Sequence, residues 1–322
     1  MVDASLATSP TDTQPHSQAV PSLGSVAILA VFKSIGMLPI SLRSALGAAL
    51  GSIVGRLPTR ETKIATLQLR AFFPEVSPSQ IVPKIFANVG RSMLESLNLK
   101  PYLRFPYDNI ACPQWDQIVS WTKEDRPVIA LTAHTGNWDL LAAYTIARGI
   151  PLSTVGKEAK NPQFQVALRA MREAYGIDTI WRSDKSGIKR IVGCFKERRV
   201  MAALIDQDTR VDSVFVPFFG ELAKTPSALV DLGKRYNARF VSAFIVRTGG
   251  RNFEIHTREL DASQETSGIL AQYHHHLEGI VRAHPDQWVW FHKRWRSDPS
   301  GTTLGTKDYL KLLERKIGSS RS

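Results

Sequence analysis

Between residues 128 and 283, short apolar runs alternate with longer segments whose apolar residues recur at a helical spacing. Residues 128–133 and 200–205 are short and almost entirely apolar, as strands buried on both faces are. Residues 162–174, between them, are amphipathic at a helical repeat. Two later strands, 240–246 and 252–256, pair across a Gly-Gly turn. This order predicts an α/β fold in which helices flank a mixed central sheet.

The same patterns predict the remaining elements. Thr225 and Pro226 suit an N-cap and a first helical position, so we expect a helix over residues 225–236. Further helices are expected over residues 77–99, 140–148, 186–197, 268–283 and 306–317, and a further strand over residues 177–181.

The chain before residue 58 has two segments of different composition. Residues 1–22 contain no Lys or Arg and are rich in Ser, Thr and Pro, which predicts a disordered tail and no secretory signal. Residues 23–57 are apolar but have no stretch of the ~20 apolar residues that a spanning helix needs. We expect one or two helices that anchor the protein in the membrane face, with Lys33, Arg43 and Arg56 at the headgroups. The alternative is that these helices cap the core of the remaining domain, 58–322.

Gly47 and Gly51 stand four positions apart within the apolar segment. Small residues at this spacing permit close contact between helices.

Overall, 41 Lys and Arg against 29 Asp and Glu give a formal charge of +12. That excess favours a polyanionic partner: nucleic acid, an anionic membrane face or an acidic carrier protein.

The stretch His134-Thr-Gly-Asn-Trp-Asp139 follows strand 128–133 directly, where side chains at the end of a sheet point into a crevice. One turn of chain brings the Asp139 carboxylate within reach of a ring nitrogen of His134. A carboxylate there fixes the imidazole tautomer, so that the other nitrogen acts as a general base. Backbone N–H groups of Gly136 to Trp138 are candidates to stabilise an oxyanion. An incidental histidine beside a capping aspartate is the alternative.

Two other functions fit parts of the sequence. Asp206-Gln-Asp208 resembles the Asp-x-Asp of metal-dependent glycosyltransferases. Trp288, Trp290 and Trp295 stand among basic residues, as in proteins that stack nucleic-acid bases. The run 274–276 of three histidines is expected at the surface, because consecutive helical residues point in different directions. The chain has no nucleotide-binding Gly-rich turn, and residues 23–57 have no role in nucleic-acid binding, so we expect neither a metal site nor a cofactor, and no nucleic-acid partner.

Several motifs occur together in this chain, in a fixed order. The His134 stretch is followed by Lys157-Glu-Ala-Lys-Asn161, by Arg172 and by Asp206-Gln-Asp208. Ser213-Val-Phe-Val-Pro-Phe-Phe-Gly220 and His292-Lys-Arg-Trp-Arg296 complete the series. This series resembles the bacterial lipid A biosynthesis acyltransferases, the lauroyl and myristoyl transferase family of the lysophospholipid acyltransferase superfamily. The likeness covers residues 35–299.

The resemblance implies a fold like that of glycerol-phosphate acyltransferases and an enzyme at the cytoplasmic face of the inner membrane. Such an enzyme moves a fatty acyl chain from an acyl carrier protein or acyl-CoA thioester to a hydroxyl of a membrane lipid, such as a lipid A precursor. It also implies that His134 and Asp139 are the catalytic pair and that Arg172, Asp206 and Lys157 bind substrate. Many family members have Glu at position 139 and Arg at position 157, so the departures concern the acceptor more than the reaction.

Overall fold

The computed structural model describes residues 22–319, so the expected tail lies outside the described residues apart from Ser22, which caps the first helix. Seven strands form the central sheet, and every neighbouring pair is parallel except β8 and β9. The predicted mixed α/β sheet is confirmed. In sheet order, the strands are β1 (Ile110–Ala111), β9 (Asn252–Leu260), β8 (Arg239–Gly249), β2 (Val128–Thr132), β5 (Val200–Leu204), β3 (Leu152–Gly156) and β4 (Asp178–Trp181).

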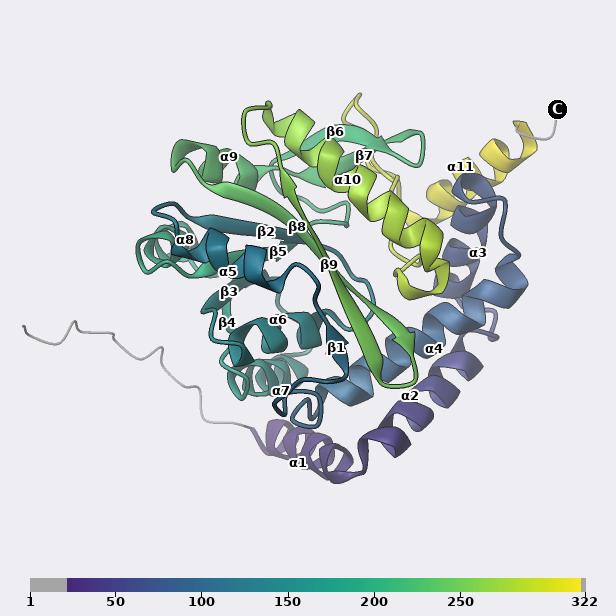
Figure 1. Cartoon of the computed structure of the whole chain (residues 1–322). Coiled ribbons are helices and arrows are strands. Elements are labelled where there is room, and N and C mark those ends of the chain that lie inside the picture. Colours follow the sequence, from purple (N-terminus) through teal and green to yellow (C-terminus); the bar gives the residue numbers. More distant parts are fainter. Residues whose placement is uncertain (1–21, 320–322) are drawn as a thin grey trace, which may run out of the picture.

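Helices surround this sheet on both faces (Figure 1). The expected helices occur with boundaries shifted by a few residues. The α-helices of the described residues are α1 (Leu23–Met37), α2 (Ile40–Val54), α3 (Arg60–Phe72), α4 (Pro78–Ser96), α5 (Trp115–Lys123), α6 (Trp138–Ala147), α7 (Pro162–Glu173), α8 (Gly187–Lys196), α9 (Ala228–Arg235), α10 (Thr266–Ala283) and α11 (Thr306–Ser319). Of these, α3 and α5 were not predicted from the sequence.

The helix expected from Thr225 begins later than predicted. Residues 213–226 form an antiparallel hairpin of β6 (Ser213–Phe218) and β7 (Glu221–Pro226), and α9 follows with Ser227 as its N-cap. Thr225 pairs with Val214 in this hairpin, and its hydroxyl is buried beside Arg294. Tertiary pairing therefore overrides the local helix signal of Thr-Pro.

The sheet separates two apolar cores. Ile129 and Leu131 of β2 face one core, which α3, α4, α8, α9 and α10 complete. Val128 and Ala130 face the other core, which contains side chains of α5 and α6. This alternation follows from the two-residue repeat of a strand, and it explains why β2 is apolar along its whole length.

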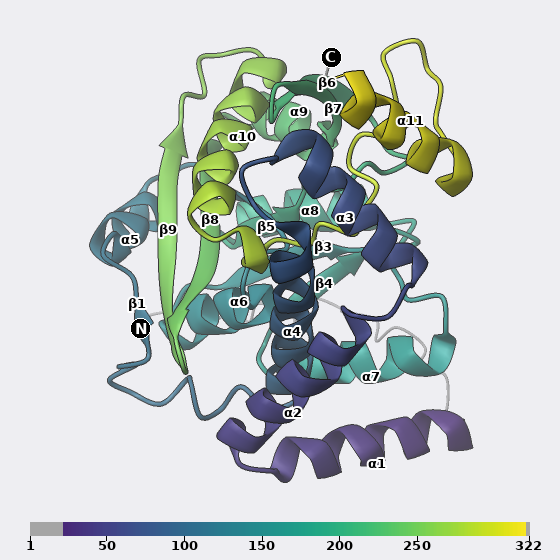
Figure 2. The same ribbon diagram turned by 90° about the vertical axis from the view of Figure 1, so that its right-hand side faces the viewer.

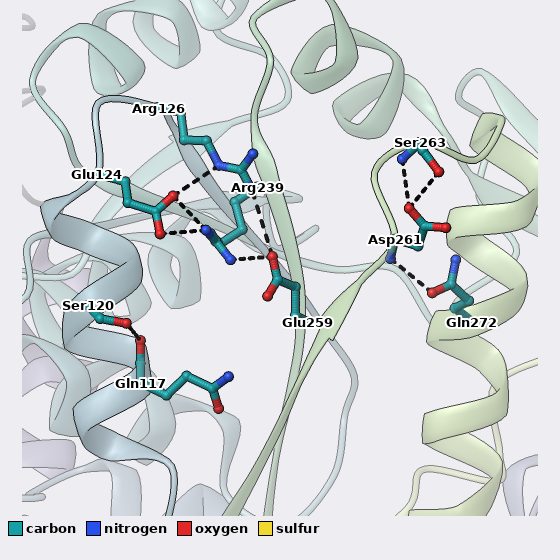
Figure 3. A network of polar contacts seen from close by, with 9 residues as sticks. All are labelled: Gln117, Ser120, Glu124, Arg126, Arg239, Glu259, Asp261, Ser263 and Gln272. Atoms are coloured by element: carbon teal, nitrogen blue, oxygen red, sulfur yellow. Dashed lines mark hydrogen bonds and ion pairs between the residues drawn. The ribbon is translucent and has the colours of Figure 1, made fainter.

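A network of ion pairs lies at the end of the sheet where β2 and β8 begin (Figure 3). The buried Arg239 guanidinium binds Glu124, which ends α5, at 2.5 Å, and it also binds Glu259 of β9. Arg126 lies 3.4 Å from Glu124 and 3.6 Å from Glu259. The network therefore fastens α5 to the β8–β9 hairpin, over the second core.

Helix α2 packs tightly against α4 (Figure 2). A Cβ added at Gly47 would lie 2.3 Å from the carbonyl oxygen of Gly90, and one at Gly51 would lie 2.0 Å from that of Phe86. Only glycine allows this approach of the two backbones, as the sequence predicts.

The prediction that Arg43 reaches the lipid headgroups is wrong. Its side chain is fully buried and donates to the main-chain carbonyls of Leu38, Leu94, Glu95 and Asn98. The carbonyls at the end of α4 have no partners within that helix and carry partial negative charge, so they attract a guanidinium. Arg43 therefore locks α2 onto α4.

No helix within residues 22–319 is by itself long and apolar enough to cross a membrane. Helices α1 and α2 meet that test only when taken together, and they are bent by 116° at the break between them. Both helices expose large apolar side chains, and on α2 these follow one stripe: Leu42, Leu46, Leu50 and Ile53.

Candidate functional site

The predicted His134 turn links β2 to α6 at the carboxyl end of the sheet. Asn137 is the N-cap of α6, since its side-chain oxygen accepts from the N–H of Leu140 at 3.0 Å. Gly136 adopts φ +51°, and a Cβ there would lie 2.4 Å from the carbonyl oxygen of Ile245 in β8. Glycine is thus required at this position on both counts.

Two separate segments hold this turn in place. From α4, the Ser92 hydroxyl donates to the Gly136 carbonyl at 2.7 Å. From the loop after α10, the Gln287 carbonyl accepts from the Gly136 N–H at 3.1 Å, and Trp288 forms an antiparallel bridge with Thr135. The Gly136 N–H is therefore already engaged, contrary to its expected role as an oxyanion donor.

The imidazole of His134 is paired with Asp206, which comes from the neighbouring strand β5. Nδ1 lies 2.7 Å from Asp206 Oδ1, while the His134 main-chain N–H donates to Oδ2 at 2.9 Å. The parallel register of β2 and β5 matches Thr132 with Leu204, so His134 and Asp206 follow at equivalent positions. This two-point contact fixes the ring orientation and leaves Nε2 as the basic nitrogen.

Asp206 is completely buried and also accepts from Trp288 Nε1 at 3.0 Å. Burial acts to raise the pKa of the Asp206 carboxyl, but the facing His134 charge and hydrogen bonds lower it more. The pKa of Asp206 therefore lies well below its ordinary value. Asp206 remains a carboxylate and can stabilise an imidazolium on His134.

Asp139 has a different partner from the predicted one. In the first turn of α6, its Oδ1 lies 3.1 Å from Nε of Arg172, the basic residue that ends α7. Both side chains are largely buried. The His134–Asp139 hydrogen bond expected from their spacing is replaced by two pairs, His134–Asp206 and Asp139–Arg172.

An apolar cavity of about 80 Å³ is lined in part by Asp139 and Arg172. Thr132 and Trp138, on either side of His134 in the sequence, line it together with Asp139 and Arg172. The Trp138 ring lies edge-on to the His134 ring, with 4.9 Å between centroids. From there the cavity extends between the sheet and α5, lined by Ala130, Ala202, Leu152, Val200, Ile118 and Trp121.

A second, polar pocket adjoins the cavity and shares Arg172 with it. Arg169 and Arg172 both lie over the Trp181 ring, at 5.7 and 5.9 Å from its centroid. Arg169 has no ion-pair partner within residues 22–319. Lys157, the other expected binding residue, is exposed on the loop after β3, does not line either pocket and has no partner among the described side chains.

The residues that suggested a metal-dependent glycosyltransferase or a nucleic-acid-binding protein have other contacts in the structure. Asp206 serves His134, whereas Asp208 accepts from the Ser297 main chain at 3.0 Å and faces Arg296 at 3.4 Å, so the two carboxylates do not converge. The tryptophans proposed to stack bases are packed in the core: Trp288, Trp290 and Trp295 are at most 6% exposed.

The prediction of a surface run of histidines is wrong for His274. This ring is buried, with Nδ1 2.8 Å from the Pro217 carbonyl and Nε2 2.9 Å from the buried Arg294 guanidinium. Burial, followed by the Arg294 charge, lowers the pKa of His274 well below its ordinary value. His274 is thus a neutral core residue that helps to satisfy a buried arginine.

Two residues of the site, Gln207 and His292, stand within the quoted motifs but were assigned no role at the site from the sequence. Gln207 Nε2 lies 3.3 Å from Nε2 of both His134 and His292, and the two imidazole rings are 5.1 Å apart. Gln207 follows Asp206 directly at the end of β5, a position that by itself would have marked it as a candidate. His292 comes from a loop far along the chain, which no local signal connects to His134.

The fold and the site define an α/β enzyme with a histidine–carboxylate pair next to an apolar cavity, which the adjacent Trp138 lines. Residues 11–297 match the family model described as bacterial lipid A biosynthesis acyltransferase, and the chain belongs to this family. It is 26% identical to lipid A biosynthesis acyltransferase 2 of Shigella flexneri over 82% of this chain and 86% of that protein. It is also 26% identical to the lipid A biosynthesis myristoyltransferase of Escherichia coli K12, over 85% and 87% of the two chains.

A more distant relative is the phosphatidylinositol mannoside acyltransferase of Mycobacterium tuberculosis, with 23% identity over 54% of this chain and 55% of that protein. All three relatives are named as acyltransferases. The protein is accordingly an acyltransferase that transfers groups other than aminoacyl groups, as the sequence motifs predicted.

Proposed function

We propose that this enzyme transfers a fatty acyl chain from a carrier thioester to a hydroxyl of a lipid A precursor or a related glycolipid. The observation that carries the proposal is the His134–Asp206 pair, which lies next to Trp138, a residue of the cavity lining. A thioester is already activated, so the enzyme has to make the hydroxyl nucleophilic. His134 Nε2 takes the hydroxyl proton while Asp206 stabilises the resulting imidazolium, as a carboxylate does in a catalytic triad.

The apolar cavity accommodates the acyl chain in this proposal. Its floor follows β2 from Thr132 to Val128 and β5 from Leu204 to Val200. Four residues of strand correspond to about 13 Å of depth. Ala130 and Ala202 are matched in register halfway along this floor, where their small side chains leave the cavity open. Side-chain volume at these alanines would then limit acyl length.

Arg172 and Arg169 are placed to bind an anionic group of a substrate. The Asp139–Arg172 pair lies at the boundary between the apolar cavity and the polar pocket. In this proposal it is therefore close to both the thioester of the donor and the charged part of the substrate. Arginine binds phosphate through two parallel hydrogen bonds. In the proposal Asp139 holds Arg172 in place, Asp206 orients the base, and Lys157 contacts substrate only at the outer rim.

The basic stretch of α8 bears on the choice of donor. Arg190 binds Asp178 at 2.6 Å and Asp184 at 3.1 Å, and Arg198 binds Asp125. Lys185 and Lys189 remain exposed and unpaired within the described chain, near the carboxyl end of the sheet where the site lies. Exposed lysines there favour an acidic acyl carrier protein over acyl-CoA as the donor.

We place the enzyme at the cytoplasmic face of the inner membrane, with the apolar stripe of α2 and the exposed face of α1 in the lipid. Helix α1 packs on α7, which carries Arg172, so a lipid acceptor would approach the site from the membrane side. The ring of Phe32 on α1 meets that of Phe164 on α7 at 5.8 Å.

The function is tested with purified enzyme in lipid nanodiscs, thioesters of several chain lengths on acyl carrier protein and on CoA, and a lipid A precursor. We expect mass spectrometry to show the gain of one acyl group, and Ala202→Leu to shift the preference to shorter chains because the added atoms fill the cavity. Undiminished activity of Ala202→Leu on the shortest donor is the control for folding. Acylation of phosphatidylinositol mannoside alone would reassign the acceptor, and no product with any lipid would refute the function.

The membrane placement is tested by Leu46→Glu combined with Leu50→Glu. Both side chains are exposed on α2, away from the α4 contact, so the charges should leave the fold intact but move the protein from the membrane to the soluble fraction. Ile188→Glu, at a residue 74% exposed on α8, is the matched control and should stay with the membrane. Equal fractionation of both variants would contradict the assignment.

A further inference from the structure

The oxyanion formed during acyl transfer needs a hydrogen-bond donor, and the expected main-chain donors are in part engaged. The Gly136 N–H donates to the Gln287 carbonyl at 3.1 Å, and the Thr135 N–H donates to the Ala133 carbonyl at 2.8 Å. Both contacts are within the framework that holds the turn in place. With the Gly136 N–H engaged, a donor from outside the turn would strengthen the oxyanion site.

The side-chain amide of Gln207 is close to His134 without blocking its basic nitrogen. Gln207 Nε2 lies 3.5 Å from His134 Nδ1 and 3.3 Å from Nε2. A group in line with the Nε2 lone pair would be much farther from Nδ1 than from Nε2. The nearly equal distances therefore place the amide beside the ring, and the lone pair of Nε2 stays open to a substrate hydroxyl.

His292 holds this amide from the other side. Its Nε2 lies 3.3 Å from Gln207 Nε2, and its ring is nearly perpendicular to that of His134. Burial, followed by the charge of His134, lowers the pKa of His292 to about 3. His292 is thus neutral at physiological pH and accepts one N–H of the amide, which leaves the second N–H of Gln207 for another acceptor.

We propose that Gln207 donates a hydrogen bond to the oxyanion of the tetrahedral intermediate, with His292 as its positioning residue. The inference rests on the proposed function. As the acceptor oxygen bonds to the thioester carbon, its proton moves to His134 Nε2 and the carbonyl oxygen becomes an oxyanion beside the Gln207 N–H. Collapse of the intermediate re-forms the carbonyl and expels the thiolate, which takes the proton from His134.

Gln207→Leu tests this role, because leucine keeps similar bulk but has no donor. We expect kcat to fall by about 10²–10³-fold, as when one oxyanion donor is removed elsewhere. KM, the melting temperature and the pH midpoint of kcat/KM should stay close to wild type. Affinity for a phosphonate that mimics the tetrahedral intermediate should fall in parallel with kcat/KM. Gln117→Leu, at an exposed position on α5, is the control and should match wild type.

Two results would overturn the proposal. A loss of less than threefold, or unchanged phosphonate affinity, would mean that Gln207 only packs against the ring. A higher kcat with a shifted pH midpoint would mean that the amide caps the resting base. His292→Phe should show a smaller loss of kcat and phosphonate affinity at an unchanged pH midpoint. Because each variant is compared with active wild-type enzyme, inactive wild type would instead count against the proposed function.

Discussion

His134→Ala should lower kcat by about 10²–10⁴-fold while the protein stays folded. Among the described histidines, His134 alone has its ring fixed by a fully buried carboxylate, and its side chain is still 19% exposed. Its loss therefore removes proton transfer and little core packing. The measurement is steady-state acyl transfer with saturating donor, alongside the melting temperature.

The chain offers a matched control in His275, which is exposed on α10. His275→Ala should transfer acyl groups like wild type. If correctly folded His134→Ala kept wild-type turnover, general-base catalysis by this residue would be ruled out.

Asp206→Asn should be more damaging than Asp139→Asn. The Asp206 carboxylate accepts from both Nδ1 and the main chain of His134, so an amide there favours the wrong tautomer, a change that costs ~10⁴-fold in kcat in a catalytic triad. Asp139→Asn does not change the contacts of His134, but it removes the charge that holds Arg172 in place. We expect its effect mainly in the KM for the anionic substrate. The reverse ranking would show that Asp139 becomes the partner of His134 during turnover.

A stability measurement tests the charge of Asp206 independently of catalysis. The pKa of Asp206 is depressed in the folded protein, so its charge stabilises the fold above the unfolded pKa of ~3.9, and this contribution is lost as the pH falls further. Asp206→Asn should thus be less stable than wild type at neutral pH, and the difference in the free energy of unfolding should narrow below about pH 4. A difference independent of pH would mean that packing, rather than charge, is lost.

Much of the element order and the position of the proposed base could be predicted from the sequence by itself. Residues 128–133 and 200–205 are strands because apolar, branched side chains suit a sheet buried on both faces, and this depends on local composition alone. Most of the helices were predictable from their repeat, although α3 and α5 were missed, and His134 was predictable from its position just after a strand. Gly47 and Gly51 likewise revealed a close helix contact, since only small residues permit it.

Only the tertiary structure decided how the charged groups pair. Asp139 is near His134 in the sequence, but the first turn of α6 directs it to Arg172 of α7. Asp206 is 72 residues away, yet it meets the imidazole because β2 and β5 are neighbours in register. The burial of Arg43 has the same origin, since carbonyls at the end of another helix accept from it. Periodicity reports which face of an element is buried, whereas the partner of a buried charge depends on which elements become neighbours.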